Sequence, residues 1–177
     1  MRITTKRSAG FIKNIIICLF FVSIASSCGV YSFSGVNIPP DIKTVFIGNF
    51  YNEAGNGPAN LGQRFTEDLK DYFQQNTNLT LVNAEGDLQF EGNIVGYNTT
   101  PVAPTASTGN NPYPTTNLTR LTITVKVIYT NTKDEKASYD QNFSWYADYG
   151  RDQNLSVVEN DLIETINQQL VFDIFNK

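Results

Sequence analysis

The feature that most constrains this fold is the alternation of apolar and polar residues over 118–130. The apolar set is Leu121, Ile123, Val125, Val127 and Tyr129, and the polar set includes Arg120, Thr122, Thr124 and Lys126. Successive side chains of a β-strand point to opposite faces, so this pattern predicts a strand with one buried face and one wet face. A sheet built around it needs an apolar layer on one side only.

Two amphipathic helices are predicted to supply that layer. An apolar residue recurs at every fourth position over 61–76, and the same spacing recurs near the end of the chain. The second helix is predicted to begin at Ser156, because Ser156 and Glu159 have the spacing of a capping box. The two apolar stripes are Leu61, Phe65, Leu69 and Phe73 in the first helix, and Leu162, Ile166, Leu170 and Ile174 in the second. Each stripe predicts one side that faces the core.

Further strands are predicted at 43–50, 79–82, 87–97 and 139–149, with a polar hairpin loop at 131–136. Residues 43–50 are dense in β-formers and are predicted to be buried on both faces. Gly92 and Gly96 lie inside a strand pattern, where they indicate a bulge or a close approach of two backbones. The order β-α-β-β-β-β-α predicts an α+β fold, a two-layer sandwich with two helices packed on one face of a mixed, mainly antiparallel sheet of about four to five strands.

The first 27 residues have the three parts of a secretory signal peptide. A basic leader precedes an apolar run over 15–25, which is too short to cross a bilayer, and small residues then lead to Cys28. Small residues that end in a cysteine are typical of the bacterial lipobox, in which the peptidase cuts before the cysteine and the thiol receives a diacylglycerol. We therefore expect residues 1–27 to be removed and Cys28 to carry the lipid. The alternative is an ordinary secreted protein whose first cysteine lies here by chance.

Removal of the leader leaves an acidic chain with one predicted domain. Four of the 13 basic residues and none of the 17 acidic residues precede Cys28, so the mature chain has a net charge of −8. This charge disfavours nucleic acid and anionic lipid head groups, which are bound through Lys and Arg. The mature chain has no cysteine pair, so the fold must be held by its core. We expect residues 28–37 to form a tether or first strand, and residues 38–177 to form a single domain.

The residues that most often carry catalysis are missing from the mature chain. The sequence has no histidine, and its other cysteine, Cys18, leaves with the signal. Histidine is the commonest general base and metal ligand. A hydrolase with two carboxylates stays open as an alternative, although Glu67, Asp68 and Asp71 fall on the predicted solvated side of a helix. We therefore expect a binding protein rather than an enzyme, with no metal and no cofactor.

A long connection between two predicted strands is the main candidate for partner binding. Residues 101–117 hold four of the seven prolines, although a short turn could have joined the strands. Loops of this length without secondary structure are uncommon in compact domains and are usually functional or disordered. The candidate partner-binding residues are Pro101, Pro104, Asn110, Pro112, Tyr113 and Pro114. The alternative is a solvated loop that has no partner.

Six short motifs, taken in their order along the chain, carry a resemblance to a known family. They are Cys-Gly-Val-Tyr-Ser-Phe-Ser-Gly at 28–35, Ile-Pro-Pro-Asp-Ile-Lys-Thr-Val at 38–45, Phe-Thr-Glu-Asp-Leu-Lys-Asp-Tyr-Phe at 65–73, Thr-Asn-Leu-Thr-Leu-Val at 77–82, Gly-Asp-Leu-Gln-Phe-Glu-Gly at 86–92 and Leu-Thr-Ile-Thr-Val-Lys-Val at 121–127. Together they resemble the LptE family of lipopolysaccharide-assembly lipoproteins in its Bacteroidetes-type form. The resemblance covers essentially all of the mature chain, and it rests on the order of the motifs.

The resemblance implies a lipoprotein on the periplasmic side of the outer membrane. Members of the family bind and plug the LptD β-barrel and assist the delivery of lipopolysaccharide, a further expected partner, to the cell surface. The family fold places two helices on a four-stranded sheet. Acidic residues soon after the lipidated cysteine are linked to surface export in the Bacteroidetes group, and the segment 29–33 has none. The periplasmic side is therefore expected.

The acidic charge of the mature chain departs from the family, whose members contact lipopolysaccharide through basic residues. Arg120 and Lys126 are the only basic pair on the polar side of the alternating strand. They are the candidates for contact with an anionic ligand, and ordinary charge on a sheet surface is the alternative. The second functional hypothesis is a glycan-binding or other surface lipoprotein of the outer membrane, which would use exposed tyrosines.

Overall fold

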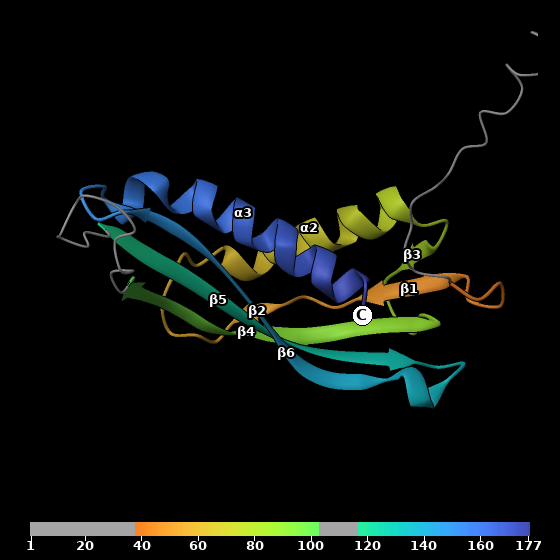
Figure 1. Ribbon diagram of the computed structural model, residues 1–177. Helices are drawn as coiled ribbons and strands as arrows, with labels where there is room; N and C mark the ends of the chain where they lie inside the picture. The colour runs from red at the N-terminus through yellow and green to blue at the C-terminus, as the bar shows by residue number, and fades with distance from the viewer. Residues whose placement is uncertain (1–37, 103–116) are drawn as a thin grey trace, which may run out of the picture. The chain divides into compact units, whose positions relative to one another are not determined.

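The computed structural model describes residues 38–102 and 117–177, which form one sheet and two helices (Figure 1). The strands are β1 (Thr44–Ile47), β2 (Tyr51–Asn52), β3 (Thr80–Val82), β4 (Leu88–Pro101), β5 (Leu118–Asn131) and β6 (Tyr139–Gly150). The helices are α2 (Leu61–Asn76) and α3 (Leu155–Phe175), and a short 3-10 helix, η1 (Glu135–Ala137), lies between β5 and β6. The predicted signal peptide, Cys28 and the predicted tether fall outside the described residues.

The sheet is mixed and runs in the order β3-β1-β4-β5-β6, with the short β2 beside β4. β1 is parallel to both β3 and β4, and β2 is parallel to β4. The long pairs β4–β5 and β5–β6 are antiparallel. The predicted α+β sandwich is confirmed, and the short β2 raises the number of strands to six, slightly above the predicted range.

Two glycines in β4 mark the irregularities that the sequence predicts. A bulge shifts the β4–β5 register between Ile94 and Gly96. At Gly92 the two strands come so close that a Cβ atom would lie 2.0 Å from the backbone oxygen of Lys126. No side chain fits there, so Gly92 permits the close pairing of the two longest strands.

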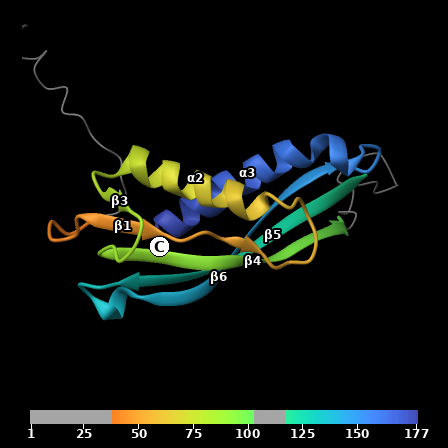
Figure 2. The same ribbon diagram turned by 180° about the vertical axis from the view of Figure 1, so that it is seen from behind.

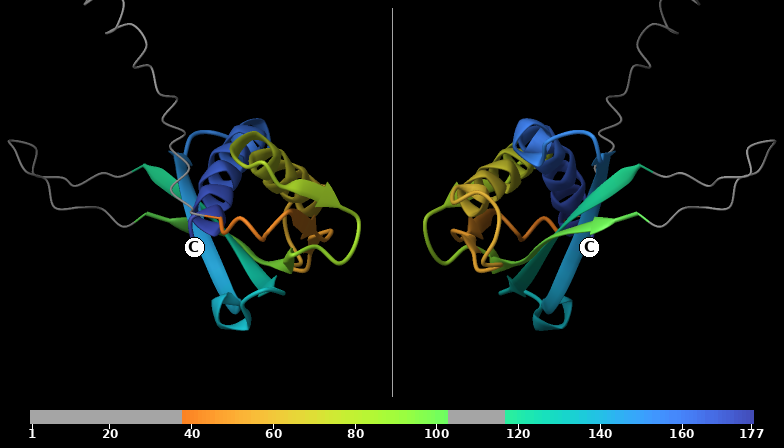
Figure 3. Two further views of the ribbon diagram at one scale, coloured as in Figure 1. Left: turned by 90° about the vertical axis from the view of Figure 1, so that its right-hand side faces the viewer. Right: turned by 90° about the vertical axis from the view of Figure 1, so that its left-hand side faces the viewer.

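Both helices lie on one face of the sheet and leave the other face open (Figure 2, Figure 3). α2 has the bounds that its apolar spacing predicts, and both predicted apolar stripes are buried. The predicted start of α3 is wrong, because the helix begins at Leu155 and is capped by Asn154, whose side chain accepts a hydrogen bond from the Ser156 N–H at 3.1 Å. Glu159 accepts instead from the hydroxyl of Tyr97 in β4.

The segment 43–50 is buried on one side only, which corrects the prediction of two buried faces. Val45 and Ile47 are buried, whereas Thr44 and Phe46 are half-buried. Both helices cover the same face of the sheet, so the opposite face of β1 keeps contact with solvent. A run of β-formers therefore does not reveal by itself how many layers cover a strand.

Candidate functional site

Both basic candidates lie on the open face of the sheet. Arg120 and Lys126 of β5 alternate with buried residues that face the helices, as the sequence predicts. They are six residues apart along the strand, which corresponds to about 20 Å. The fold therefore places them on one face without bringing them together at one site.

Arg120 is engaged by a carboxylate of the neighbouring strand. Its Nε and Nη2 atoms donate hydrogen bonds to the two carboxylate oxygens of Asp148 at 2.7 and 2.9 Å. Its Cζ atom lies 3.5 Å from the ring centroid of Tyr146. The hydrogen bonds from Arg120 lower the pKa of Asp148, and the same contact raises the pKa of Arg120. An anionic ligand at Arg120 would have to compete with Asp148 for a bidentate donor.

Lys126 has a similar but more exposed partner. Its Nζ atom lies 3.1 Å from an Oδ2 atom of Asp140 in β6. Between the two ion pairs, the hydroxyls of Thr124 and Ser144 form a hydrogen bond of 3.0 Å. Because β6 supplies both carboxylates, this part of the open face carries balanced charges rather than a cationic patch.

The candidate loop leaves the sheet at the tips of its two longest strands, which reach beyond the helices (Figure 3). Pro101 is the last residue of β4 and stands in register with Thr119. The Val102 N–H donates to the Leu118 carbonyl at 3.1 Å, so the base of the loop is held at both strands. The other loop candidates, Pro104, Asn110, Pro112, Tyr113 and Pro114, lie outside the described residues.

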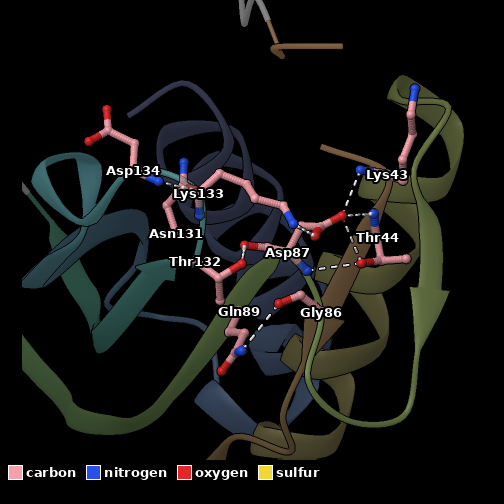
Figure 4. A network of polar contacts seen from close by, with 9 residues as sticks. All are labelled: Lys43, Thr44, Gly86, Asp87, Gln89, Asn131, Thr132, Lys133 and Asp134. Atoms are coloured by element: carbon pink, nitrogen blue, oxygen red, sulfur yellow. Dashed lines mark hydrogen bonds and ion pairs between the residues drawn. The ribbon is translucent and has the colours of Figure 1, made fainter. Parts of the chain in front are cut away.

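The opposite end of the sheet holds a polar network centred on Asp87, the residue before β4 (Figure 4). Its Oδ2 atom accepts hydrogen bonds from the backbone N–H groups of Lys43 and Thr44 at 2.8 and 3.0 Å, and from the Thr44 hydroxyl at 3.0 Å. Its Oδ1 atom lies 3.0 Å from the Lys133 Nζ atom. The Asp87 carbonyl accepts from the N–H and hydroxyl of Thr132 at 2.9 and 3.0 Å. One residue thus joins the start of β1, the start of β4 and the β5–β6 hairpin.

These contacts hold the pKa of the Asp87 carboxyl far below its ordinary value. The hydrogen bond from the Lys43 N–H is the largest cause, and the Lys133 ammonium is the next. The hairpin that presents Lys133 is itself ordered by Asn131, whose Oδ1 atom accepts from two backbone N–H groups at 2.9 and 3.0 Å. Reasoning from the sequence missed this network, because Asp87 and Lys43 are 44 positions apart. The polar groups of the network use one another as hydrogen-bond and ion-pair partners, so the network stabilises the fold.

Exposed aromatic rings add a second type of contact surface at β6. Trp145 and Tyr146 stack with ring centroids 5.9 Å apart, and they are 37% and 44% exposed. Within 38–102 and 117–177 no group of three or more acidic, histidine or cysteine side chains is arranged to hold a metal ion. The same ranges contain no helix with the length and hydropathy needed to cross a bilayer.

Comparisons with known proteins identify a family and a fold. A family model described as LptE, lipopolysaccharide-assembly, matches residues 42–177. No curated protein matches the sequence. The solved structure of the hypothetical protein CT253 from Chlamydia trachomatis is 11% identical with a TM-score of 0.52, covering 76% of this chain and 96% of that one. A minor lipoprotein from Acinetobacter baumannii is 14% identical with a TM-score of 0.47, covering 76% and 90%. At these identities the structural likeness concerns the fold alone.

Proposed function

This chain belongs to the LptE lipopolysaccharide-assembly family, and we propose that it binds and plugs an LptD-type β-barrel of the outer membrane and assists assembly of lipopolysaccharide at the cell surface. The family match, which extends over residues 42–177, is the observation that carries the proposal. In this proposal the protein is a non-catalytic lipoprotein, anchored through Cys28 on the periplasmic side of the outer membrane.

The strand tips are the part of the domain that we assign to the barrel. The ends of β4 and β5 that flank the candidate loop reach beyond the helical layer, and a backbone hydrogen bond from Val102 to Leu118 joins them there. A rigid base lowers the entropy that the loop loses when it is ordered by a partner, and proline lowers it further. The loop has no charged residue, which suits a confined site where an unpaired charge would be costly.

Arg120 and Lys126 are the proposed contacts for an anionic ligand such as lipopolysaccharide. Arg120 is the better placed of the two, because it lies opposite Thr100, one residue from the start of the candidate loop. Its bidentate pairing with Asp148 orients the planar guanidinium along the open face. A phosphate would bind there by replacing one carboxylate oxygen or by sharing the fork of donors.

The test replaces Val102 to Thr115 by a short Gly-Asn turn that keeps both strands. The affinity-tagged full chain is then purified from the native membrane, and the recovery of an outer-membrane barrel is measured. We expect barrel recovery to fall sharply while the domain melts as before, because the core and the Asp87 network are untouched. The matched control changes three exposed residues at the other end of the sheet, with Asn83→Ser, Ala84→Ser and Glu85→Gly, and should recover the barrel normally.

Two outcomes would contradict parts of the proposal. Unchanged recovery with the shortened loop would remove the loop from the interface. Failure of the unaltered protein to recover any barrel would remove barrel binding altogether. A glycan-binding lipoprotein would then be the better hypothesis, because the Trp145 ring is 37% exposed and offers an aromatic surface to a sugar ring.

A further inference from the structure

An apolar cavity opens at the end of the sandwich where the described chain begins. Its volume is about 320 Å³. Phe90, Tyr129 and Tyr139 from three neighbouring strands form one side, with successive ring centroids 4.8 and 5.0 Å apart. Phe175 of α3 and Ile38, the first described residue, also line the cavity. Segments from both ends of the described chain and from the middle of the sheet therefore share one cavity.

The chemistry of this cavity favours a hydrocarbon occupant over water. A water molecule needs two to four polar partners, and apolar walls supply few of them. The cavity opens to solvent, but its walls are largely aromatic and aliphatic. Burial against these walls raises the pKa of the Tyr139 hydroxyl, which has no hydrogen-bond partner among the described residues. One polar group at the apolar cavity is therefore free to meet a ligand.

The rim carries charges of both signs, and only some of them are used within the domain. Lys133 is paired with Asp87, and the Asp134 side chain accepts from the Lys136 N–H. Asp41 and Lys177 also line the cavity, and the side chain of neither forms an ion pair or hydrogen bond with any other residue that the structure describes. A cation and a carboxylate are thus available for a head group that itself carries both charges.

The position of the cavity close to Cys28 in the sequence indicates that membrane lipid is the hydrocarbon nearest to it. Only the residues 29–37 separate Ile38 from Cys28, the predicted lipidation site. An extended chain spans at most ~3.6 Å per residue, so this tether keeps the cavity within about 35 Å of the bilayer surface. Such a tether gives the cavity a high effective concentration of membrane lipid. The acidic mature chain disfavours anionic lipids, so a zwitterionic lipid fits the charge of both the rim and the domain.

We propose that this cavity takes up one acyl chain of a zwitterionic membrane phospholipid, with the phosphate beside Lys177 and the lipid cation beside Asp41. The bound chain holds this end of the domain at the bilayer surface and restricts the orientations that the tether allows. The inference rests on the cavity and on the predicted lipidation of Cys28, and it is independent of barrel binding.

The test uses the full lipidated chain in phosphatidylethanolamine vesicles that contain a trace of phosphatidylcholine with a diazirine in one acyl chain. After irradiation and digestion, mass spectrometry locates the crosslinks. We expect crosslinks on the peptides that contain Tyr139 and Phe175. Ala137→Trp places an indole at the cavity from an exposed position of η1 and should reduce these crosslinks about tenfold. Glu135→Trp adds the same bulk to an exposed η1 residue that does not line the cavity, and it should leave them unchanged.

A second variant keeps the test decisive if Ala137→Trp fails to fold. Lys177→Gln removes the free cation without changing the cavity, and it should lower crosslinking about threefold, the scale of an exposed charge pair. Crosslinking that is unchanged in Lys177→Gln and in a folded Ala137→Trp would overturn the proposal. Absence of crosslinks from the cavity peptides of the unaltered protein would also overturn it. If a co-purified protein instead shields the cavity peptides from crosslinking, the cavity binds a side chain of that protein. This result would also overturn the proposal of a lipid occupant.

Discussion

At one end of the sheet a single carboxylate, Asp87, joins three segments of the chain, whereas at the other end the polar groups pair two at a time. The Asp87 side chain receives three hydrogen bonds and an ion pair, and it is 17% exposed. At the loop end, Arg120 and Asp148 bind mainly each other, with side chains 34% and 26% exposed. An ion pair on an open strand surface contributes little to stability, whereas a carboxylate that satisfies several backbone donors fixes their geometry.

This contrast in polar contacts distinguishes the end of the domain that stabilises the fold from the end that is available to bind a partner. The clamped end fixes the register of β1 against β4 and the position of the β5–β6 hairpin. The loop end can change its side chains without loosening these elements, because few contacts depend on them. We therefore expect substitutions at the Asp87 end to act on folding, and substitutions at the loop end to act on binding.

The largest expected effect lies in the core that both ends share. Ile166 is fully buried in the middle of α3. Ile166→Ala should lower the free energy of unfolding by about 2–5 kcal/mol, because it removes buried methyl groups and leaves a cavity. Denaturant unfolding followed by circular dichroism measures this and sets the scale for both ends. A change within experimental error would show that this side of α3 is not core.

The next effect tests the clamped end. Asp87→Asn should clearly lower Tm at pH 7. The Asp87 carboxylate presents two acceptor oxygens to four donor groups, whereas the asparagine amide has only one acceptor oxygen. The folded pKa of Asp87 lies well below its ordinary value of 3.8, so the folded state binds fewer protons than the unfolded state in acid. The stabilisation by Asp87 is therefore complete above the unfolded pKa and is lost as pH falls through the folded pKa.

Thermal melts of the wild type and of Asp87→Asn over a range of pH test this prediction. The difference in Tm between the wild type and Asp87→Asn should be constant near neutral pH and should narrow below about pH 4. Asp140→Asn removes the exposed ion pair with Lys126 and should change Tm far less. An equal loss of stability in Asp87→Asn and Asp140→Asn would contradict the contrast between a clamp and a surface pair.

The smallest effect on stability is expected at the loop end. The double substitution Arg120→Gln with Asp148→Asn removes both charges together and should shift Tm much less than Asp87→Asn, because an exposed pair is screened by solvent. Thermal melts at low and high salt measure the shift. A loss as large as that of Asp87→Asn would mean that the two ends of the sheet are equally structural.

The single substitutions at the same pair test its binding role. Asp148→Asn releases the Arg120 guanidinium from its carboxylate and should strengthen binding of lipopolysaccharide about threefold, whereas Arg120→Gln should weaken it by a similar factor. Binding is measured with the purified chain and labelled lipopolysaccharide. If both variants bind as the wild type does, Arg120 carries ordinary sheet-surface charge and should be dropped as a ligand contact.

Much of the fold could be predicted from local patterns. The four-residue apolar spacing of 61–76 predicts the bounds of α2, and the alternation over 118–130 predicts which side chains of β5 are buried. Gly92 predicts a close approach of backbones that the fold realises at Lys126. These features depend on residues close together in the chain, for which helix and strand periodicities give the answer directly. The start of α3 was missed because Asn154 competes with Ser156 for the cap.

The sequence alone therefore determined the two helices, the longer strands, the apolar side of both helices and of β5, and the family resemblance, since these depend on neighbouring residues and on the order of short motifs. Only the tertiary structure decided the carboxylate partners of Arg120 and Lys126, the clamp at Asp87 and the cavity beside Tyr139. The physical reason is that each of these features joins groups from different segments of the chain. Lys43 and Asp87 are 44 positions apart, and no local periodicity predicts a contact over that separation. Strand order and register bring such groups together, and both are set by the packing of the whole domain.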